Sequence, residues 1–130
     1  TLMSQLEEAG LVKNKAKLLA QFSQSQAEAD KLVHQAGFWT LVDESERLFS
    51  WLLAHKKESY LQVAKLTSLA DDKEKQDYVL RILEVLAGQE ILNVSARNIL
   101  QNLVQTRKMW RANVSFQNAL EYLVLQKNLK

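Results

Sequence analysis

The fold is decided by the stretch RANVSFQNALEYLVL, residues 111–125. Asn113-Val114-Ser115 interrupts two helical patterns, and Ser115 is a good N-cap because its hydroxyl accepts a hydrogen bond from a backbone N–H of the first turn. Apolar residues then recur at the i, i+3, i+4, i+7 and i+8 spacing of one helix face: Phe116, Ala119, Leu120, Leu123 and Val124. The stretch therefore predicts a turn followed by an amphipathic helix.

The composition favours helix throughout the chain. The 130 residues are 47% hydrophobic and 25% charged, which is typical of a globular domain rather than a disordered segment. There are no prolines and only three glycines, so few positions favour a sharp turn. The sequence therefore predicts an all-α fold, a helical bundle, with seven or eight helices.

The same composition excludes several classes of site. The absence of cysteine excludes disulfides and thiolate metal sites, and it fits a reducing, cytoplasmic location. No apolar run approaches the roughly 18 residues of a membrane-spanning helix, so we expect no membrane partner. The net charge of +2 is scattered and neither requires nor excludes nucleic acid. Because the first residues already follow a helical pattern, we expect a piece of a longer protein.

Apolar periodicity and cap signals predict the helix ranges as 2–9, 13–22, 25–36, 38–54, 60–69, 73–87, 95–110 and 116 onward. Ser25 is expected to cap the third, and Ser95 the seventh, after a loop over residues 89–94. Asp71 or Asp72 is expected to cap the sixth, and Asp71 has capping-box spacing to Glu74. Gly37 is expected to end the third helix, and Gly88 is expected to end the sixth.

Residue 37 is also the expected domain boundary. Residues 1–36 hold short helices rich in Ala, Gln and Lys, and they are too few for a core of their own. Residues 37–130 hold longer helices and all three tryptophans. The range 73–87 is apolar around most of its circumference, which predicts the central helix of the bundle.

The C-terminal part of the sequence also resembles a known protein family. A long helix ending in Arg, then Ala-Asn-Val-Ser-x-Gln, then an amphipathic helix with a Glu resembles the delta-prime family of bacterial DNA polymerase III clamp-loader subunits, in its Gram-positive form. The stretch KAKLLAQFSQSQAEADKLV, residues 15–33, resembles the end of the helical lid domain in the same AAA+ subunits. The resemblance implies that residues 1–36 end a lid domain and that residues 37–130 form a collar domain.

One departure from the lid pattern bears on function. The family pattern is Gly-Ser-x-Arg-x-Ala, whose arginine touches nucleotide phosphates, and here Ala27 stands at the arginine position. Since an alanine cannot stabilise phosphate charge, the resemblance implies a subunit that neither senses nor hydrolyses ATP through its lid and needs no cofactor. Its implied partners are the delta and gamma/tau subunits through the collar, and the sliding clamp and primed DNA through the whole complex, with no small-molecule substrate.

Candidate catalytic and metal-binding residues are not evident in the sequence. His34 and His55 are the only histidines, and no metal or nucleophile motif includes them. The acidic group Asp43, Glu44 and Glu46 is read as a solvated helix face near an N-terminus, where acids are favoured. We therefore expect this region to be non-catalytic.

Four residues are candidate interface positions: Trp51, Arg107, Arg111 and Asn113. Trp51 lies off the main apolar stripe of its helix, whereas Trp39 and Trp110 are expected in the core. Arg107 and Arg111 share a helix face, where they could contact phosphate or a neighbouring subunit, or simply favour a helix C-terminus, which is the preferred interpretation. Asn113 is expected to bond to nearby backbone in the turn, or to contact another subunit.

The resulting expectation is an assembly region that holds delta-prime in the clamp-loader pentamer. Two alternatives stay open: the collar of another clamp-loader subunit, delta or gamma/tau, or a helical DNA-binding module that uses Arg107, Lys108 and Arg111. The DNA-binding alternative predicts a steep dependence of duplex binding on salt.

Overall fold

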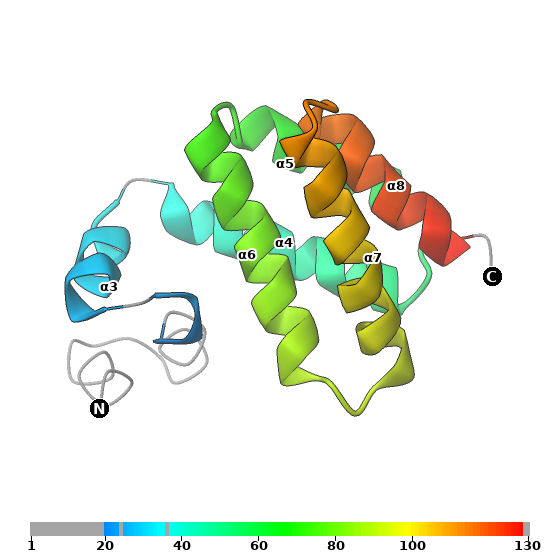
Figure 1. Ribbon diagram of the computed structural model, residues 1–130, viewed down its shortest axis with the longest axis horizontal. Helices are drawn as coiled ribbons and strands as arrows, with labels where there is room; N and C mark the ends of the chain where they lie inside the picture. Colours follow the sequence, from blue (N-terminus) through cyan, green and yellow to red (C-terminus); the bar gives the residue numbers. More distant parts are fainter. Residues whose placement is uncertain (1–19, 24, 36, 129–130) are drawn as a thin grey trace. The chain divides into compact units, whose positions relative to one another are not determined.

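The computed structural model describes residues 20–128 apart from residues 24 and 36, and the regular structure within that range is entirely α-helical (Figure 1). The predicted all-α class is confirmed. The elements are α3 (Gln26–Val33), α4 (Phe38–Leu53), α5 (Ser59–Leu69), α6 (Lys73–Gln89), α7 (Val94–Arg111) and α8 (Phe116–Asn128). The expected helix over 2–9 and most of the one over 13–22 lie outside the described residues. None of the described helices is long and apolar enough to cross a membrane.

The chain divides into two compact units, Thr1–Thr40 and Leu41–Lys130. In the first unit, Ser25 caps α3 as predicted, since its Oγ accepts a hydrogen bond of 3.1 Å from the Glu28 N–H. The helix ends at Val33, earlier than expected. Gly37 does not stop it directly but adopts a φ of +82° just before α4, a left-handed conformation that costs glycine little. The aromatic rings of Phe22 and Phe38 meet edge to face at 5.6 Å between centroids.

In the second unit, α6 packs against α7, α7 against α8, and α8 against α5. Figure 1 shows α6 and α7 as a helical hairpin, with α8 on the far side of α7. The apolar face predicted for α8 is confirmed, because all five of its residues are buried. In α4 the predicted stripe is buried too, and α6 contributes a dense set of core side chains: Tyr78, Val79, Leu80, Ile82, Leu83 and Ala87.

Two Schellman-type turns end α4 and α7. After α4, His55 has a φ of 55°, its N–H bonds to the Leu52 carbonyl and the Lys56 N–H bonds to the Trp51 carbonyl. After α7, Asn113 has a φ of 71° and the N–H of the next residue reaches the Met109 carbonyl at 3.0 Å. In each turn, backbone N–H groups bond to the last carbonyls of the helix. Both turns place a non-glycine residue in the left-handed conformation, which costs conformational energy.

Several predicted helix ends are wrong. Gly88 does not end α6, because it does not adopt the positive φ of a helix-ending glycine, and the helix continues through Gln89 to the C-cap Glu90. The N-cap of α7 is Asn93 and not Ser95, since the Asn93 side chain accepts from the Ala96 N–H at 3.2 Å. The loop between α6 and α7 is correspondingly shorter than expected.

At the start of α6, Asp72 is the cap and accepts from the Lys75 N–H at 2.8 Å. The capping box predicted between Asp71 and Glu74 does not form. Asp71 instead pairs with the Lys75 ammonium at 2.9 Å, and Glu74 accepts from the Tyr78 hydroxyl at 3.0 Å.

The buried face of α5 is not the one that its apolar residues suggest. The sequence offers Tyr60, Leu61, Ala64 and Leu69 as its apolar residues, but the buried face consists of Ser59, Gln62, Val63 and Leu66. The two buried polar residues are accommodated because each has a partner. Ser59 donates to the Lys56 carbonyl, and Gln62 donates to the backbone of α4. The helix is therefore rotated so that Tyr60 and Leu61 face outward.

Candidate functional site

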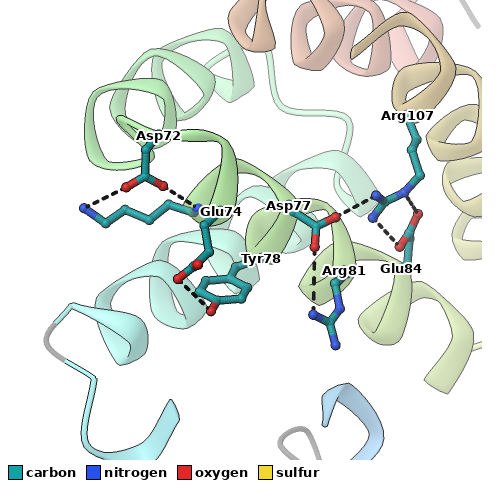
Figure 2. Close-up of polar contacts among 8 residues, drawn as sticks. Asp72, Glu74, Asp77, Tyr78, Arg81, Glu84 and Arg107 are labelled. Atoms are coloured by element: carbon teal, nitrogen blue, oxygen red, sulfur yellow. Dashed lines mark hydrogen bonds and ion pairs between the residues drawn. The ribbon is translucent and has the colours of Figure 1, made fainter. Parts of the chain in front are cut away.

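Arg107 is the best-anchored of the candidate interface residues. Its Nε and Nη2 atoms donate to the two Glu84 carboxylate oxygens at 2.9 Å each, and its Nη1 donates to Asp77 at 2.8 Å. Figure 2 shows the guanidinium of α7 clamped between these two carboxylates of α6. The side chain is only 15% exposed. Arg107 thus ties α7 to α6 within the chain, which differs from both interpretations offered by the sequence.

The electrostatics of this clamp favour the charged form of Arg107. Hydrogen bonding to Glu84, together with Asp77, raises the pKa of the Arg107 guanidinium. Asp77 also faces Arg81 at 3.8 Å, so one carboxylate bridges two arginines (Figure 2). The bidentate pair between Arg107 and Glu84 fixes the orientation of the guanidinium in addition to the electrostatic attraction. A phosphate would have to displace these carboxylates to reach Arg107, which argues against its use in DNA binding.

Arg111 and Asn113 lie in a different setting, at the exposed end of α7 and in the following turn. Arg111 belongs to the last turn of α7, where a cation interacts favourably with the helix dipole, as the preferred interpretation anticipated. Asn113 contributes to the turn through its left-handed backbone. No side-chain hydrogen bond of Asn113 is formed within the described part of the chain, so the predicted bond from its amide to nearby backbone is absent there.

Asn113 also borders a pocket of about 420 Å³ at the junction of α5, α6, α7 and α8. On one wall the Lys73 ammonium lies 5.2 Å from the centroid of the Trp110 ring, and the Trp110 indole N–H donates to Gln76 at 2.8 Å. Trp110 is only partly buried, so its predicted place in the core is wrong, and Gln76 of α6 satisfies its indole N–H. The pocket is lined by Thr67, Lys73, Gln76, Trp110, Asn113, Val114, Ser115, Phe116 and Gln117.

Trp51 occupies the last turn of α4, next to the corner that leads into α5. It is partly exposed, and the Lys56 ammonium lies 5.5 Å from its ring centroid. The Schellman turn at residues 54–56 brings Lys56 back over the ring, because its N–H bonds to the Trp51 carbonyl. Trp51 is thus neither buried in the core nor fully exposed, and part of its side chain remains accessible to a partner.

A buried carboxylate was missed by the sequence analysis. Glu44 was read as part of a solvated face, and this is wrong: its residue is 6% exposed. Its Oε2 pairs with Lys65 at 2.9 Å and its Oε1 with Arg47 at 3.5 Å, while Gln62 donates to its backbone carbonyl at 2.8 Å. The hydrogen bond from Lys65 lowers the pKa of the Glu44 carboxyl, followed by the bond that Gln62 Nε2 donates to Glu44 Oε2 at 3.4 Å and by the charge of Arg47. The group joins α4 to α5, and no local sequence pattern signals it.

The described surface carries two sets of exposed apolar side chains. On α5, Leu61 is 71% and Tyr60 is 41% exposed. At the tip of the α6–α7 hairpin, Leu92 is 90% exposed, beside Ile91 and Val94. Single exposed apolar residues are ordinary, but adjacent ones are typical of interaction surfaces. Sequence analysis could have found the second set, because Ile91, Leu92 and Val94 are apolar residues within the range 89–94 that it predicts as a loop.

Ala27 is exposed in the second helical position of α3, after the Ser25 cap, and it brings no charge to that helix start. Among the described residues, no group of three or more His, Cys, Asp or Glu side chains is arranged to hold a metal ion. The arrangement of the described side chains thus offers contact surfaces and structural ion pairs.

Comparisons with known proteins add no relative. No protein-family model, no curated protein and no solved structure matches this chain.

Proposed function

We propose that this chain is the non-catalytic assembly region of a delta-prime subunit, holding it in the cytoplasmic clamp-loader pentamer that places the sliding clamp on primed DNA. The observation that carries the proposal is the ending RANVSFQNALE, residues 111–121, whose likeness to the family was set out above. Its residues build the α7–α8 turn and the first two turns of α8, so the likeness falls on the part that closes the bundle.

Two structural features support an assembly role. Adjacent apolar residues are exposed on α5 and at the α6–α7 tip, as expected of a helical bundle that packs against unlike neighbours. The guanidinium groups of Arg81 and Arg107 are paired with Asp77 and Glu84 within the chain, so these two cations are less accessible to phosphate. A head-to-tail ring gains stability from several modest contacts at once, so no single large interface is required.

The choice of subunit rests on the lid position. Ala27 in place of a phosphate-touching arginine favours delta-prime over the ATP-binding gamma/tau subunit. The delta or gamma/tau collar remains the alternative within the family. The DNA-binding alternative is weakened because the Arg107 guanidinium is engaged by Glu84 and Asp77.

The test is co-purification of the affinity-tagged chain with the delta and gamma/tau subunits of the source organism. We expect both partners to be retained at physiological salt, and a Leu120→Asp variant, which disrupts the buried face of α8, to lose them. A parallel assay measures binding to duplex DNA at several salt concentrations. Retention of duplex with a steep salt slope, and no retention of either subunit, would replace the assembly proposal with the DNA-binding one.

A further inference from the structure

The corner between α4 and α5 combines exposed apolar side chains with positive charge. We define the α4–α5 corner as Trp51, Lys56, Lys57, Tyr60 and Leu61. The two helices meet beside this corner, because Glu44 of α4 pairs both with Arg47, one turn before Trp51, and with Lys65 of α5, one turn after Leu61. Leu61 is 71% exposed and Tyr60 41%, and Trp51 is partly exposed.

The flanks of this corner are basic. Lys56 and Lys57 are exposed within it, and Glu58 is the one exposed acid of the turn. One helical turn further along each helix the flanking residue is again a cation: Arg47 on α4, 51% exposed, and Lys65 on α5, 53% exposed. The exposed Asp43 lies one turn before Arg47 on the stripe that Trp51 continues, at its end away from the corner, whereas Glu46 projects from a different side of the helix than Trp51.

Glu44 keeps these two outer cations in place. Its buried carboxylate holds Lys65 at 2.9 Å and Arg47 at 3.5 Å, so both side chains are anchored on the rim rather than free to turn away. Because Glu44 is buried while the cations are half exposed, a partner meets the positive ends and not the carboxylate. The rim is thus pre-organised for negative charge.

From this geometry we propose that the α4–α5 corner docks an acidic amphipathic helix of another protein chain, whose apolar face covers Trp51, Tyr60 and Leu61 and whose flanking carboxylates meet Lys56, Lys57, Lys65 and Arg47. This is the helix-on-surface mode of recognition, with apolar anchors supplying affinity and rim charges supplying orientation. The proposal goes beyond the assembly role and does not rest on it, because the occupant is defined by its chemistry alone.

The experiment uses the full 130-residue chain, labelled with nitrogen-15, and three synthetic peptides. The first peptide is an 18-residue amphipathic helix with leucines on one face and glutamates beside them. The second carries lysine at each glutamate position, and the third is a scrambled form of the first. The readout is the indole N–H signal of each tryptophan, and Trp110, whose indole is bonded to Gln76, serves as the internal reference.

The acidic peptide is expected to shift the Trp51 signal, leave the Trp110 signal in place, and bind at least about tenfold more tightly than the lysine peptide. A Leu61→Glu variant should weaken binding by about tenfold or more, which corresponds to about 1.4 kcal/mol. The matched control is Leu92→Glu, which places the same change on a leucine that is 90% exposed at the α6–α7 tip and should leave binding unchanged. Since both leucines are exposed, circular dichroism should show the native helicity in both variants.

Three results would overturn the proposal. The first is an unshifted Trp51 signal at millimolar acidic peptide, and the second is equal binding of the acidic and lysine peptides or equal loss in the two variants. The third comes from light scattering: a dimer of the unmodified chain that Leu61→Glu dissolves would assign the corner to a second copy of this chain.

Discussion

Substitution of Arg107 by alanine tests how the α6–α7 hairpin is held together. In the structure this side chain makes three hydrogen bonds of 2.8–2.9 Å to Glu84 and Asp77, and it is 15% exposed. The alanine variant removes all three and leaves two carboxylates on α6 without this partner. Asp77 keeps Arg81 at 3.8 Å, so the loss falls chiefly on Glu84.

The size of the effect follows from partial burial. An exposed ion pair contributes about 0–1 kcal/mol, whereas breaking a fully buried one costs about 3–5 kcal/mol. Glu84 and Asp77 are 32% and 34% exposed, so water can solvate the abandoned carboxylates in part. We therefore expect a loss of about 2 kcal/mol, including the lost packing of the arginine stem. For a unit of this size that is a fall in Tm of roughly 8–16 °C.

The assay is urea unfolding followed by circular dichroism, for the parent chain and for Arg107→Ala. The matched control is Arg111→Ala, because it removes the same side chain one turn later at an exposed position and should change stability by less than about 0.5 kcal/mol. A double-mutant cycle with Glu84→Ala should give a coupling energy of about 1–2 kcal/mol. If Arg107→Ala and Arg111→Ala are equally mild, Arg107 is not a structural tie, and its role as an interface residue returns.

Four further outcomes are expected. The pKa of Glu44 is lowered in the folded chain, so the contribution of its carboxylate to stability is present above the ordinary pKa of 4.5 and is lost as pH falls through the folded pKa. Glu44→Gln should therefore flatten the fall of the urea unfolding midpoint below pH 4.5. An unchanged pH profile in this variant would contradict the pairing of Glu44 with Lys65. Asn113 has a φ of 71°, so Asn113→Gly should be neutral or stabilising and Asn113→Val should destabilise by about 1–2 kcal/mol in thermal unfolding, an order that equal effects would refute. The Thr106 hydroxyl is buried and has no hydrogen-bond partner among the described residues, so Thr106→Val should raise stability by about 0.5–1 kcal/mol, and a clear loss would mean that the hydroxyl is satisfied. Ser115→Ala should cost about 1 kcal/mol through loss of the α8 cap while Ser115→Gly costs only a few tenths, as measured by chemical denaturation.

Local chemistry accounts for the elements that sequence analysis predicted correctly. Ser25 and Ser115 cap their helices because a hydroxyl needs only the N–H three residues ahead. The apolar face of α8 follows from spacing alone, since Phe116, Leu120 and Val124 share one side of any helix that contains them. Where one residue type at one spacing determines a cap or a helix face, the sequence is enough to predict it.

The errors occur where several local solutions compete. Asn93 and Ser95 are both good caps, and α7 begins at the earlier of the two. Gly88 looks like a stop, yet helical geometry continues past it by one residue. Asp71 has the spacing of a capping box, but the Lys75 ammonium takes its carboxylate instead. Propensity orders these choices only weakly, and packing decides among them.

The candidate site depended on contacts that no local pattern encodes. Glu44 meets Gln62 and Lys65, and Arg107 meets Asp77 across 30 positions of sequence. These long-range pairs convert polar residues into buried or partly buried ones, and the rotation of α5 that exposes Leu61 accompanies the burial of Gln62. A sequence reader counts Glu44 and Arg107 as surface charges, because their partners become visible only in the folded chain.

The most direct test of the assembly account is the molar mass of the complex by light scattering on a sizing column. The chain is run alone and then with the delta and gamma/tau subunits of the source organism at equal concentration. The account predicts a complex that contains one copy of this chain and excludes further copies when the chain is in excess. A mixture in which delta and gamma/tau bind each other while the folded chain elutes separately would contradict it.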